Sequence, residues 1–352
     1  MTEPLLQVEN LHVDFQTYGG VVQAVRGVSF DVHSGQTLAI VGESGCGKSV
    51  TVQSLMGLIP MPPGRIHQGA ATLRGRDILG SKTVEGREIR GREISMIFQD
   101  PMTSLNPTMN IGSQIAETLE LHRGYSKSEA FARAVELLDM SKIPEAAKRA
   151  KQYPFEFSGG MLQRAMIAMA IACEPAILIA DEPTTALDVT IQAQILDLLG
   201  DLQQETGMAI ILITHDLGVV ARMADEVMVM YAGEVVERGG VDDIFYHSAH
   251  PYTQGLRLAM PSNKRDEAAM GEAKLVAIDG APPDLFNPPT GCAYHPRCPY
   301  AMRVCAERAP LLKTLGPSHT TQCWLHHELA GALPAGLSAG TGETNNSTGT
   351  GL

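Results

Sequence analysis

A glycine-rich run near the N-terminus could hold phosphate. GESGCGKS, residues 42–49, fits the pattern of a glycine, four residues and Gly-Lys-Ser, in which backbone N–H groups and a lysine bind nucleotide phosphates. The hydroxyl of Ser49 would reach Mg²⁺, and Gly45 and Gly47 would let the backbone come close to the phosphates. We therefore predict an ATP site formed by Gly42, Ser44, Gly45, Cys46, Gly47, Lys48, Ser49 and Val50.

A second element that could face phosphate lies at SGGMLQR, residues 158–164. Ser158, Gly159 and Gly160 precede a helical run, and the free N–H groups at a helix start form a good anion site. The alternative is a serine N-cap that only starts the helix, and it requires the same geometry. A chain with both elements usually completes its ATP site with the second element of a partner, which indicates a dimeric nucleotide machine.

Two adjacent carboxylates follow a short apolar strand. Residues 176–180 lead into Asp181 and Glu182. Asp181 is placed to bind Mg²⁺ through water, and Glu182 is the candidate general base that polarises the attacking water. Two solvated carboxylates at a strand end are the alternative. The glycine loop in the same chain favours the catalytic interpretation.

The elements around these motifs predict an α/β domain. Residues 6–13 and 28–32 read as early strands, and residues 37–41 form a buried strand that runs into the glycine loop. A helix follows Lys48 and stops before Pro60. Strands that alternate with helices indicate a mainly parallel sheet, with functional residues at the carboxyl ends of its strands.

Further along the chain, the pattern changes twice. Residues 107–154 are helical and amphipathic without an evident strand, which predicts an inserted helical subdomain at about residues 100–155. A helix then follows Gly160, and a second buried strand at residues 209–214 delivers His215. The ATPase domain is expected to end near residue 240.

The sequence after residue 240 lacks the alternation of strands and helices seen before it. Residues 241–330 are irregular, rich in proline and contain four cysteines, which predicts an appended module. Residues 331–352 are rich in Gly, Ser, Thr and Asn and are expected to form a disordered tail.

Composition narrows the class of protein. A chain of 352 residues with 44% hydrophobic content can bury a substantial core. The net charge of −12 disfavours nucleic acid as a partner. The longest apolar run is about half of what a membrane span needs, so the chain is expected to lie in the cytosol.

With these motifs in place, residues 5–325 resemble the ATP-binding subunit of an ABC transporter of the peptide and nickel importer branch. The resemblance implies a P-loop ATPase fold with a mainly parallel core sheet, an N-terminal antiparallel β portion and the helical insert. Phe157 and Met161 stand where the family's commonest signature has Leu and Gln. This departure is mild, because the Ser and both glycines that would contact phosphate are kept.

The same resemblance assigns roles to further residues. Gln99, in IFQDP, would sense Mg²⁺ and the γ-phosphate, and His215, in LITHD, would contact the γ-phosphate and organise the water. Asp188, in TTALD, matches the loop that crosses the dimer interface. For adenine stacking, Phe15 fits the position of the family's aromatic better than Tyr18, although Phe15 could simply be a core residue.

Four cysteines in the appended module could hold a metal. Cys292, Cys298, Cys305 and Cys323 are separated by five, six and seventeen residues. Their thiolates suit zinc or an iron–sulfur cluster, and the spacing alone leaves zinc, a cluster and free thiols open. The run GCAYHPRCPYAMRVC resembles the C-terminal region of peptide-importer ATPases, which implies a [4Fe–4S] cluster.

The resemblance also implies an assembly and a location. The chain would be the energy-coupling ATPase of an importer for oligopeptides or dipeptides, peripheral at the cytoplasmic face of the cell membrane. Its partners would be a paralogous ATP-binding subunit in a heterodimer, two transmembrane permease subunits and, indirectly, an external substrate-binding protein. Nickel chelates and antimicrobial peptides remain possible substrates.

Two other functions compete with the importer. A soluble ABC ATPase acting on ribosomes or DNA would normally carry two ATPase units or long coiled-coil inserts, whereas this chain has one set of motifs and no sustained heptads. The second competing function is that of a redox or sensor protein, which would carry a cluster and also bind ATP.

Overall fold

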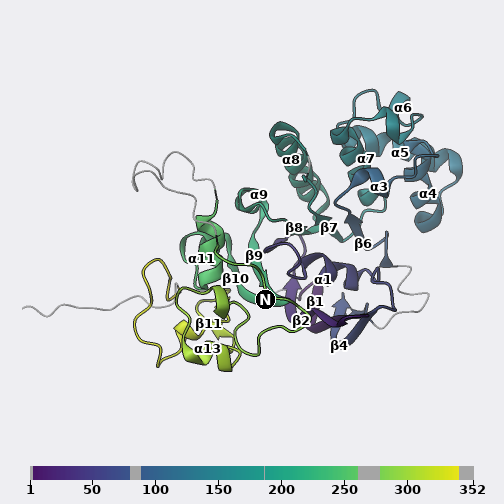
Figure 1. Cartoon of the computed structure of the whole chain (residues 1–352). Coiled ribbons are helices and arrows are strands. Elements are labelled where there is room, and N and C mark those ends of the chain that lie inside the picture. Colours follow the sequence, from purple (N-terminus) through teal and green to yellow (C-terminus); the bar gives the residue numbers. More distant parts are fainter. Residues whose placement is uncertain (1–2, 80–88, 186, 261–277, 341–352) are drawn as a thin grey trace, which may run out of the picture.

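The computed structural model describes residues 3–79, 89–185, 187–260 and 278–340. Two β-sheets occupy the centre, a helical arm lies on one side, and the C-terminal region lies on the other (Figure 1). This arrangement confirms the predicted fold class. Of the tail predicted at residues 331–352, residues 341–352 lie outside the described residues.

The core sheet has eight strands in the order β11-β12-β10-β9-β3-β8-β7-β6. Its parallel part consists of β6 (Ile94–Ile97), β7 (Ile177–Asp181), β8 (Ala209–Ile213), β3 (Thr37–Val41) and β9 (Glu226–Tyr231). Every residue of β3, β7 and β8 is buried, as expected for parallel strands covered on both faces. Their carboxyl ends therefore meet at one edge, where the predicted site residues follow.

The second sheet is antiparallel and has the order β2-β1-β4-β5. Its strands are β1 (Leu6–Thr17), β2 (Gly20–Val32), β4 (Gly64–Leu73) and β5 (Arg76–Asp77). Buried side chains such as Leu11 and Val13 join a hydrophobic cluster with Ile40 and Ile213 of the core sheet. The two sheets thus share one core, which fixes the strands on both sides of the glycine loop.

The helical arm is made from sequence signals that are easily recognised. It contains α3 (Pro101–Ser104), α4 (Ile111–Arg123), α5 (Lys127–Met140), α6 (Ala146–Arg149), η1 (Pro154–Glu156) and α7 (Gly159–Ile171). Asn110 caps α4, and Ser126 and Glu129 form a capping box at the start of α5. The amphipathic pattern of residues 107–154 therefore gives helices, as the sequence predicts.

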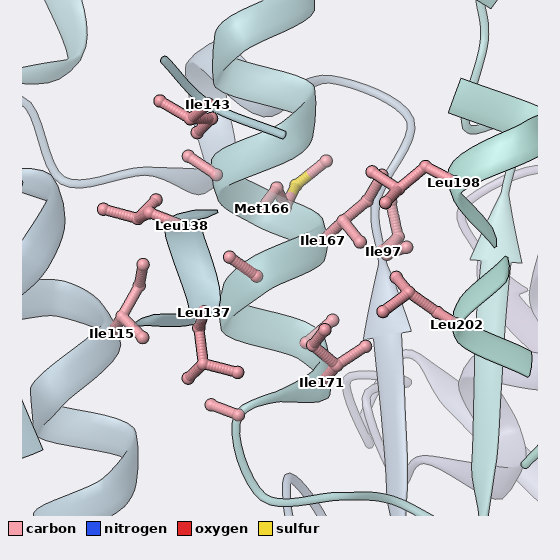
Figure 2. Packing of buried hydrophobic residues seen from close by; sticks show 14 of the residues in the cluster. Ile97, Ile115, Leu137, Leu138, Ile143, Met166, Ile167, Ile171, Leu198 and Leu202 are labelled. Atoms are coloured by element: carbon pink, nitrogen blue, oxygen red, sulfur yellow. The ribbon is translucent and has the colours of Figure 1, made fainter. Parts of the chain in front are cut away.

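Helix α7 joins this arm to the core sheet. Figure 2 shows Met166, Ile167 and Ile171 of α7 between side chains of α5, such as Leu137, and side chains of α8 (Val189–Thr206), such as Leu198. All of them belong to one buried cluster. The helix that begins at the second phosphate element is thus packed on both sides.

The C-terminal region continues the core sheet. It contains β10 (Glu234–Gly240), α10 (Val241–Tyr246), α11 (Pro251–Leu258), η2 (His295–Arg297), α13 (Arg303–Glu307), β11 (Lys313–Thr314), β12 (Thr320–Thr321) and η3 (Trp324–His326). β12 pairs with β10 through Glu237 and Thr321. The buried carboxylate of Glu237 accepts the N–H groups of Ala249 and His250 and contacts His319 Nε2 at 2.8 Å.

None of the helices in the described ranges is long and apolar enough to cross a membrane. The longest helix in the described ranges, α8, has 18 residues, which include Asp197, Asp201 and Glu205.

Candidate nucleotide site

The glycine loop lies between β3 and α1 (Lys48–Leu55), as the sequence predicts. Gly42 and Gly47 have φ values of 153° and 101°, where L side chains are strained. A Cβ at Gly42 would lie 2.2 Å from the carbonyl oxygen of Met230, and one at Gly47 would lie 2.4 Å from that of Ala24. Both positions therefore require glycine for packing as well as for backbone conformation.

Lys48 is turned into its own loop. Its Nζ donates to the carbonyl oxygens of Gly42 at 2.8 Å and Glu43 at 3.0 Å, and its side chain is almost fully buried. The first turn of α1 leaves N–H groups without acceptors inside the helix. A phosphate bound here would meet these N–H groups and the Lys48 ammonium together.

The two residues predicted to bind Mg²⁺ lie side by side. Ser49 Oγ donates to Asp181 Oδ1 at 3.0 Å, although the residues are 132 positions apart. Burial raises the pKa of Asp181 above its ordinary value, the hydrogen bond from Ser49 and the charge of Lys48 oppose this, and the charge of Glu182 adds to it. A hydroxyl and a carboxylate are oxygen ligands that suit Mg²⁺, so this pair fits the ion.

Three side chains hold the carboxylate of Glu182. Gln99 Nε2 and Thr185 Oγ1 each donate to its Oε2 at 2.9 Å, and His215 Nδ1 lies 3.2 Å from its Oε1. Burial alone would raise the pKa of Glu182, but the hydrogen bonds from Thr185 and His215 lower it. The carboxylate is therefore kept ionised, as a general base requires.

The structure brings Gln99, His215 and Glu182 together from three strand ends. Gln99 follows β6, Glu182 follows β7 and His215 follows β8. Thr185 joins them but was not predicted. It lies three residues after Glu182 in EPTT, and a hydroxyl so close behind a candidate base is the one signal in the sequence that could have pointed to it.

The second phosphate element lies on the helical arm. Ser158 is the N-cap of α7, and its hydroxyl accepts the N–H of Met161 at 3.4 Å. Ser158 and Gly159 are exposed, and no hydrogen bond joins residues 158–160 to residues 42–49, all of which the structure describes. Asp188 is the exposed N-cap residue of α8 and is followed by Val189, which is 82% exposed.

Comparison with known proteins identifies the protein family to which this arrangement of residues belongs. Residues 25–185 match the ABC transporter family model, and residues 236–305 match that of the oligopeptide/dipeptide transporter C-terminal region. The dipeptide transport ATP-binding protein DppD of Bacillus subtilis is 54% identical over 93% of this chain and 96% of its own. The oligopeptide transport ATP-binding protein OppD of Salmonella typhimurium is 53% identical over 91% of this chain and 93% of its own.

The chain belongs to the ABC transporter ATP-binding proteins of peptide importers. It is an ATPase, the energy-coupling subunit of an importer for oligopeptides or dipeptides. A solved dimeric ATP-binding cassette with ADP and phosphate bound superposes with a TM-score of 0.60 and 27% identity, covering 67% of this chain and 98% of that one. These matches favour the importer over the two competing functions.

The aromatic residue assigned to adenine in this ABC ATPase lies partly in the core. Phe15 is half-buried and packs against the hydrophobic cluster shared by the two sheets, and its ring approaches Gly64. Tyr18, at the turn between β1 and β2, is fully exposed. Val50, in the first turn of α1, also packs against this cluster. An adenine contact by Phe15 stays a prediction.

The four cysteines of the ABC ATPase's C-terminal region influence the pKa values of their neighbours among the four. Burial, aided by the charges of Cys305 and Cys298, raises the pKa of Cys292 to about 11. Burial, aided by the charges of Cys292, Cys298 and Cys305, raises the pKa of Cys323 to about 12. Within residues 3–79, 89–185, 187–260 and 278–340, however, no three His, Cys, Asp or Glu side chains are placed to hold a metal ion. The predicted cluster is therefore not supported by a ligand set in the described residues.

Proposed function

We propose that this ABC ATPase binds Mg²⁺ and ATP at residues 42–50 and that Glu182 is its catalytic base. The carboxylate held by Gln99, Thr185 and His215 is the observation that carries this proposal. Bound Mg²⁺ would neutralise charge on the phosphates. Lys48 would hold the β- and γ-phosphates, and Ser49 and Asp181 would hold the ion.

The reaction is in-line hydrolysis of the γ-phosphate. The oxygen of a water molecule bonds to the γ-phosphorus, the bond from that phosphorus to the bridging oxygen breaks, and ADP leaves. Glu182 accepts the proton of the water, since its carboxylate is ionised. His215, with a largely exposed side chain, would orient the water and contact the γ-phosphate.

We propose that Ser158, Gly159 and Gly160, the first two of them exposed, serve the nucleotide of a partner ATPase, and that Asp188 crosses to the same partner. A matched cassette is dimeric, which supports an ATPase pair. The partner is a paralogous chain in a heterodimer, and the pair acts on two permease subunits at the cytoplasmic face of the membrane. Closure on ATP and reopening after hydrolysis would move the permeases.

Replacing Glu182 with Gln tests the base. The amide keeps the size of the carboxylate but cannot accept the proton, so ATP hydrolysis should fall by about 100-fold or more while ATP binding persists. The measurement is the ATPase rate, together with the Kd for a fluorescent ATP analogue. If Glu182→Gln hydrolyses ATP at the wild-type rate, Glu182 is not the base.

We also propose that Cys292, Cys298, Cys305 and Cys323 bind a [4Fe–4S] cluster, with Zn²⁺ as the alternative. Two observations support a soft-metal site. The charges of Cys292, Cys298 and Cys305 help to raise the pKa of Cys323, and backbone N–H groups lower the pKa values of Cys292, Cys298 and Cys323 against the larger effect of burial. Such N–H groups also tune the sulfurs of clusters. Binding would have to draw the four side chains together.

Metal analysis of the purified protein distinguishes a [4Fe–4S] cluster from Zn²⁺. Protein purified without oxygen should be brown, with about four iron atoms per chain for a [4Fe–4S] cluster. Cys298→Ser should lose the iron, whereas Cys173→Ser, at a buried cysteine outside the C-terminal region, should keep it. Colourless protein with stoichiometric zinc would establish the alternative, and protein without either metal would exclude both.

A further inference from the structure

Glu43, within the phosphate-binding loop, is held by the C-terminal region. Its backbone N–H donates to the hydroxyl of Tyr252 at 2.9 Å, and its carbonyl oxygen accepts Lys48 Nζ at 3.0 Å. Its carboxylate forms two parallel hydrogen bonds with Arg297, at 2.6 and 3.0 Å. Glu43 therefore connects the phosphate-binding Lys48 to Arg297, which lies 254 positions after Glu43.

Arg297 is built into its position. Its side chain is 5% exposed, and its Nε donates to the carbonyl oxygen of Asp279 at 2.8 Å. Its two terminal nitrogens donate to Glu43, to the hydroxyl of Tyr231 and to the carbonyl oxygen of Ile278. Each nitrogen of the guanidinium thus has an acceptor, so the fork that holds Glu43 has a fixed orientation.

The support behind this ion pair is rigid. The rings of Tyr231, Tyr252 and Tyr294 pack against one another, with centroids 4.6 to 5.3 Å apart. Tyr231 ends β9 of the core sheet, Tyr252 lies in α11, and Tyr294 lies in the cysteine-containing segment. All three are buried, which joins the segment that carries Arg297 to the sheet behind the loop.

We propose that Arg297 is a positioning residue for nucleotide binding: through Glu43, it holds the phosphate-binding loop in the form that receives ATP. The inference rests on the proposed nucleotide site at Lys48. Arg297 does not contact the nucleotide. It acts on the backbone of the residue whose carbonyl oxygen Lys48 contacts.

The direction of the effect follows from what the pair constrains. Nucleotide binding needs the loop backbone to present its N–H groups together, so a loop with more freedom pays an ordering cost when ATP binds. Without Arg297, the carboxylate of Glu43, which is 26% exposed, would turn to solvent and release the loop. The loss should appear in nucleotide affinity.

The test measures the Kd for a fluorescent ATP analogue with Mg²⁺, using the full chain with Glu182→Gln to prevent hydrolysis. Arg297→Gln should raise this Kd about 10- to 100-fold, the loss typical of residues that orient a direct ligand. Arg297→Lys keeps the positive charge but not the two parallel hydrogen bonds, so its Kd should lie between those of the parent and of Arg297→Gln. Arg297→Gln with Glu43→Gln should be no worse than either alone, since both remove the same interaction.

Arg238→Gln is the matched control. Arg238 is also largely buried and pairs with Asp31 at 2.9 Å and Glu226 at 2.7 Å, at the start of β9 rather than at its end beside the loop. Its replacement should lower the thermal unfolding temperature without changing the Kd. If Arg297→Gln behaves in the same way as this control, the inference is wrong.

Lys48→Ala separates the two proposals. If this variant still binds the analogue at the wild-type Kd, the proposed nucleotide site itself is wrong. If Lys48→Ala abolishes binding and Arg297→Gln leaves the Kd within about twofold of its parent, the site stands and the role of Arg297 fails.

Discussion

The carboxylate of Glu182 is held by Gln99 and His215, from two other strand ends, and by Thr185, three residues further along the chain. Glu182 was predicted as the base from its position after a strand, and Gln99 and His215 from family resemblance. The structure adds Thr185, whose hydroxyl donates to the same carboxylate oxygen as Gln99. The position of Thr185 close behind the candidate base is a weak signal, because a threonine in EPTT is equally typical of a turn, and the three-dimensional contact is needed to assign this role.

His250 is a residue whose charge state matters for stability. It is fully buried, and its Nδ1 accepts the N–H of Tyr252 at 3.1 Å, so the neutral ring carries its proton on Nε2. Nε2 has no hydrogen-bond partner among the described residues. Burial, aided by the charge of His326, lowers the pKa of His250 to about 3. Protonation would therefore cost both a hydrogen bond and a buried charge.

We predict that His250→Asn reduces the acid sensitivity of folding. The unfolded chain takes up a proton at His250 as the pH falls through 6.5, whereas the folded chain does not until about pH 3. Stability is therefore lost on acidification, by about 2 kcal/mol between pH 7 and pH 5. Asparagine can still cap α11 but does not titrate.

Urea unfolding at pH 7 and pH 5 checks this. The wild type should lose about 2 kcal/mol more stability between the two values than the variant does. His319 and His326 are present in both proteins, so their contributions cancel. Equal losses in the two proteins would mean that His250 is not the group that senses pH.

Among the elements, α7 links the proposed partner site to the core. Its N-cap Ser158 and its first residue Gly159 are exposed, whereas its body is packed between the helical arm and α8 (Figure 2). A Cβ at Gly159 would lie no closer than 3.8 Å to Leu187, so a side chain fits there. Carboxylates at a helix N-terminus stabilise the helix, so Asp at this position should leave the fold intact.

We predict that Gly159→Asp impairs hydrolysis at the partner's loop. Its carboxylate would repel the γ-phosphate that the N–H groups of residues 158–160 are proposed to bind. Glu182→Gln can be used to stop hydrolysis at this chain's own nucleotide site. In a pair that carries it, the ATPase rate that remains at the partner's site should fall about 100-fold when Gly159→Asp is added. Nucleotide binding at Lys48 should be unchanged.

Gly200→Asp provides the matched control. Gly200 lies in α8, and nothing lies within 4 Å of a Cβ placed there. This variant should retain the partner's hydrolysis. A loss of binding at Lys48 in Gly159→Asp would instead show that both elements serve one nucleotide in the same chain.

The strands that lead into Gly42, Asp181 and His215 could be predicted from sequence to within a few residues. The buried strands β3, β7 and β8 are short apolar runs, and α7 follows its serine cap. β4 was not predicted, because GRIHQGAATL has few large apolar residues and lacks a regular alternation of apolar and polar residues. β11 and β12 have two residues each, too few for a periodic signal.

At the scale of the whole molecule, the ATPase fold and family were evident from the motifs, whereas the connection between the two ends of the chain was not. Arg297 and Glu43 are 254 positions apart, and neither stands out alone. Arg297 lies beside Cys298, and the spacing of the cysteines is the signal that stands out in this run. The contact depends on how the C-terminal segment folds back across β9.

The pairing of β12 with β10 has a consequence for how this protein can be divided. A gene cut at residue 240, where the sequence changes character, would leave β10 as an unpaired edge strand and Glu237 without its contact to His319. Exposed edges of this kind recruit other chains and aggregate. The cysteine-containing region is therefore part of the structure that protects the core sheet. An evolutionary lineage that lost this region would have had to cover the exposed edge of β10 in another way.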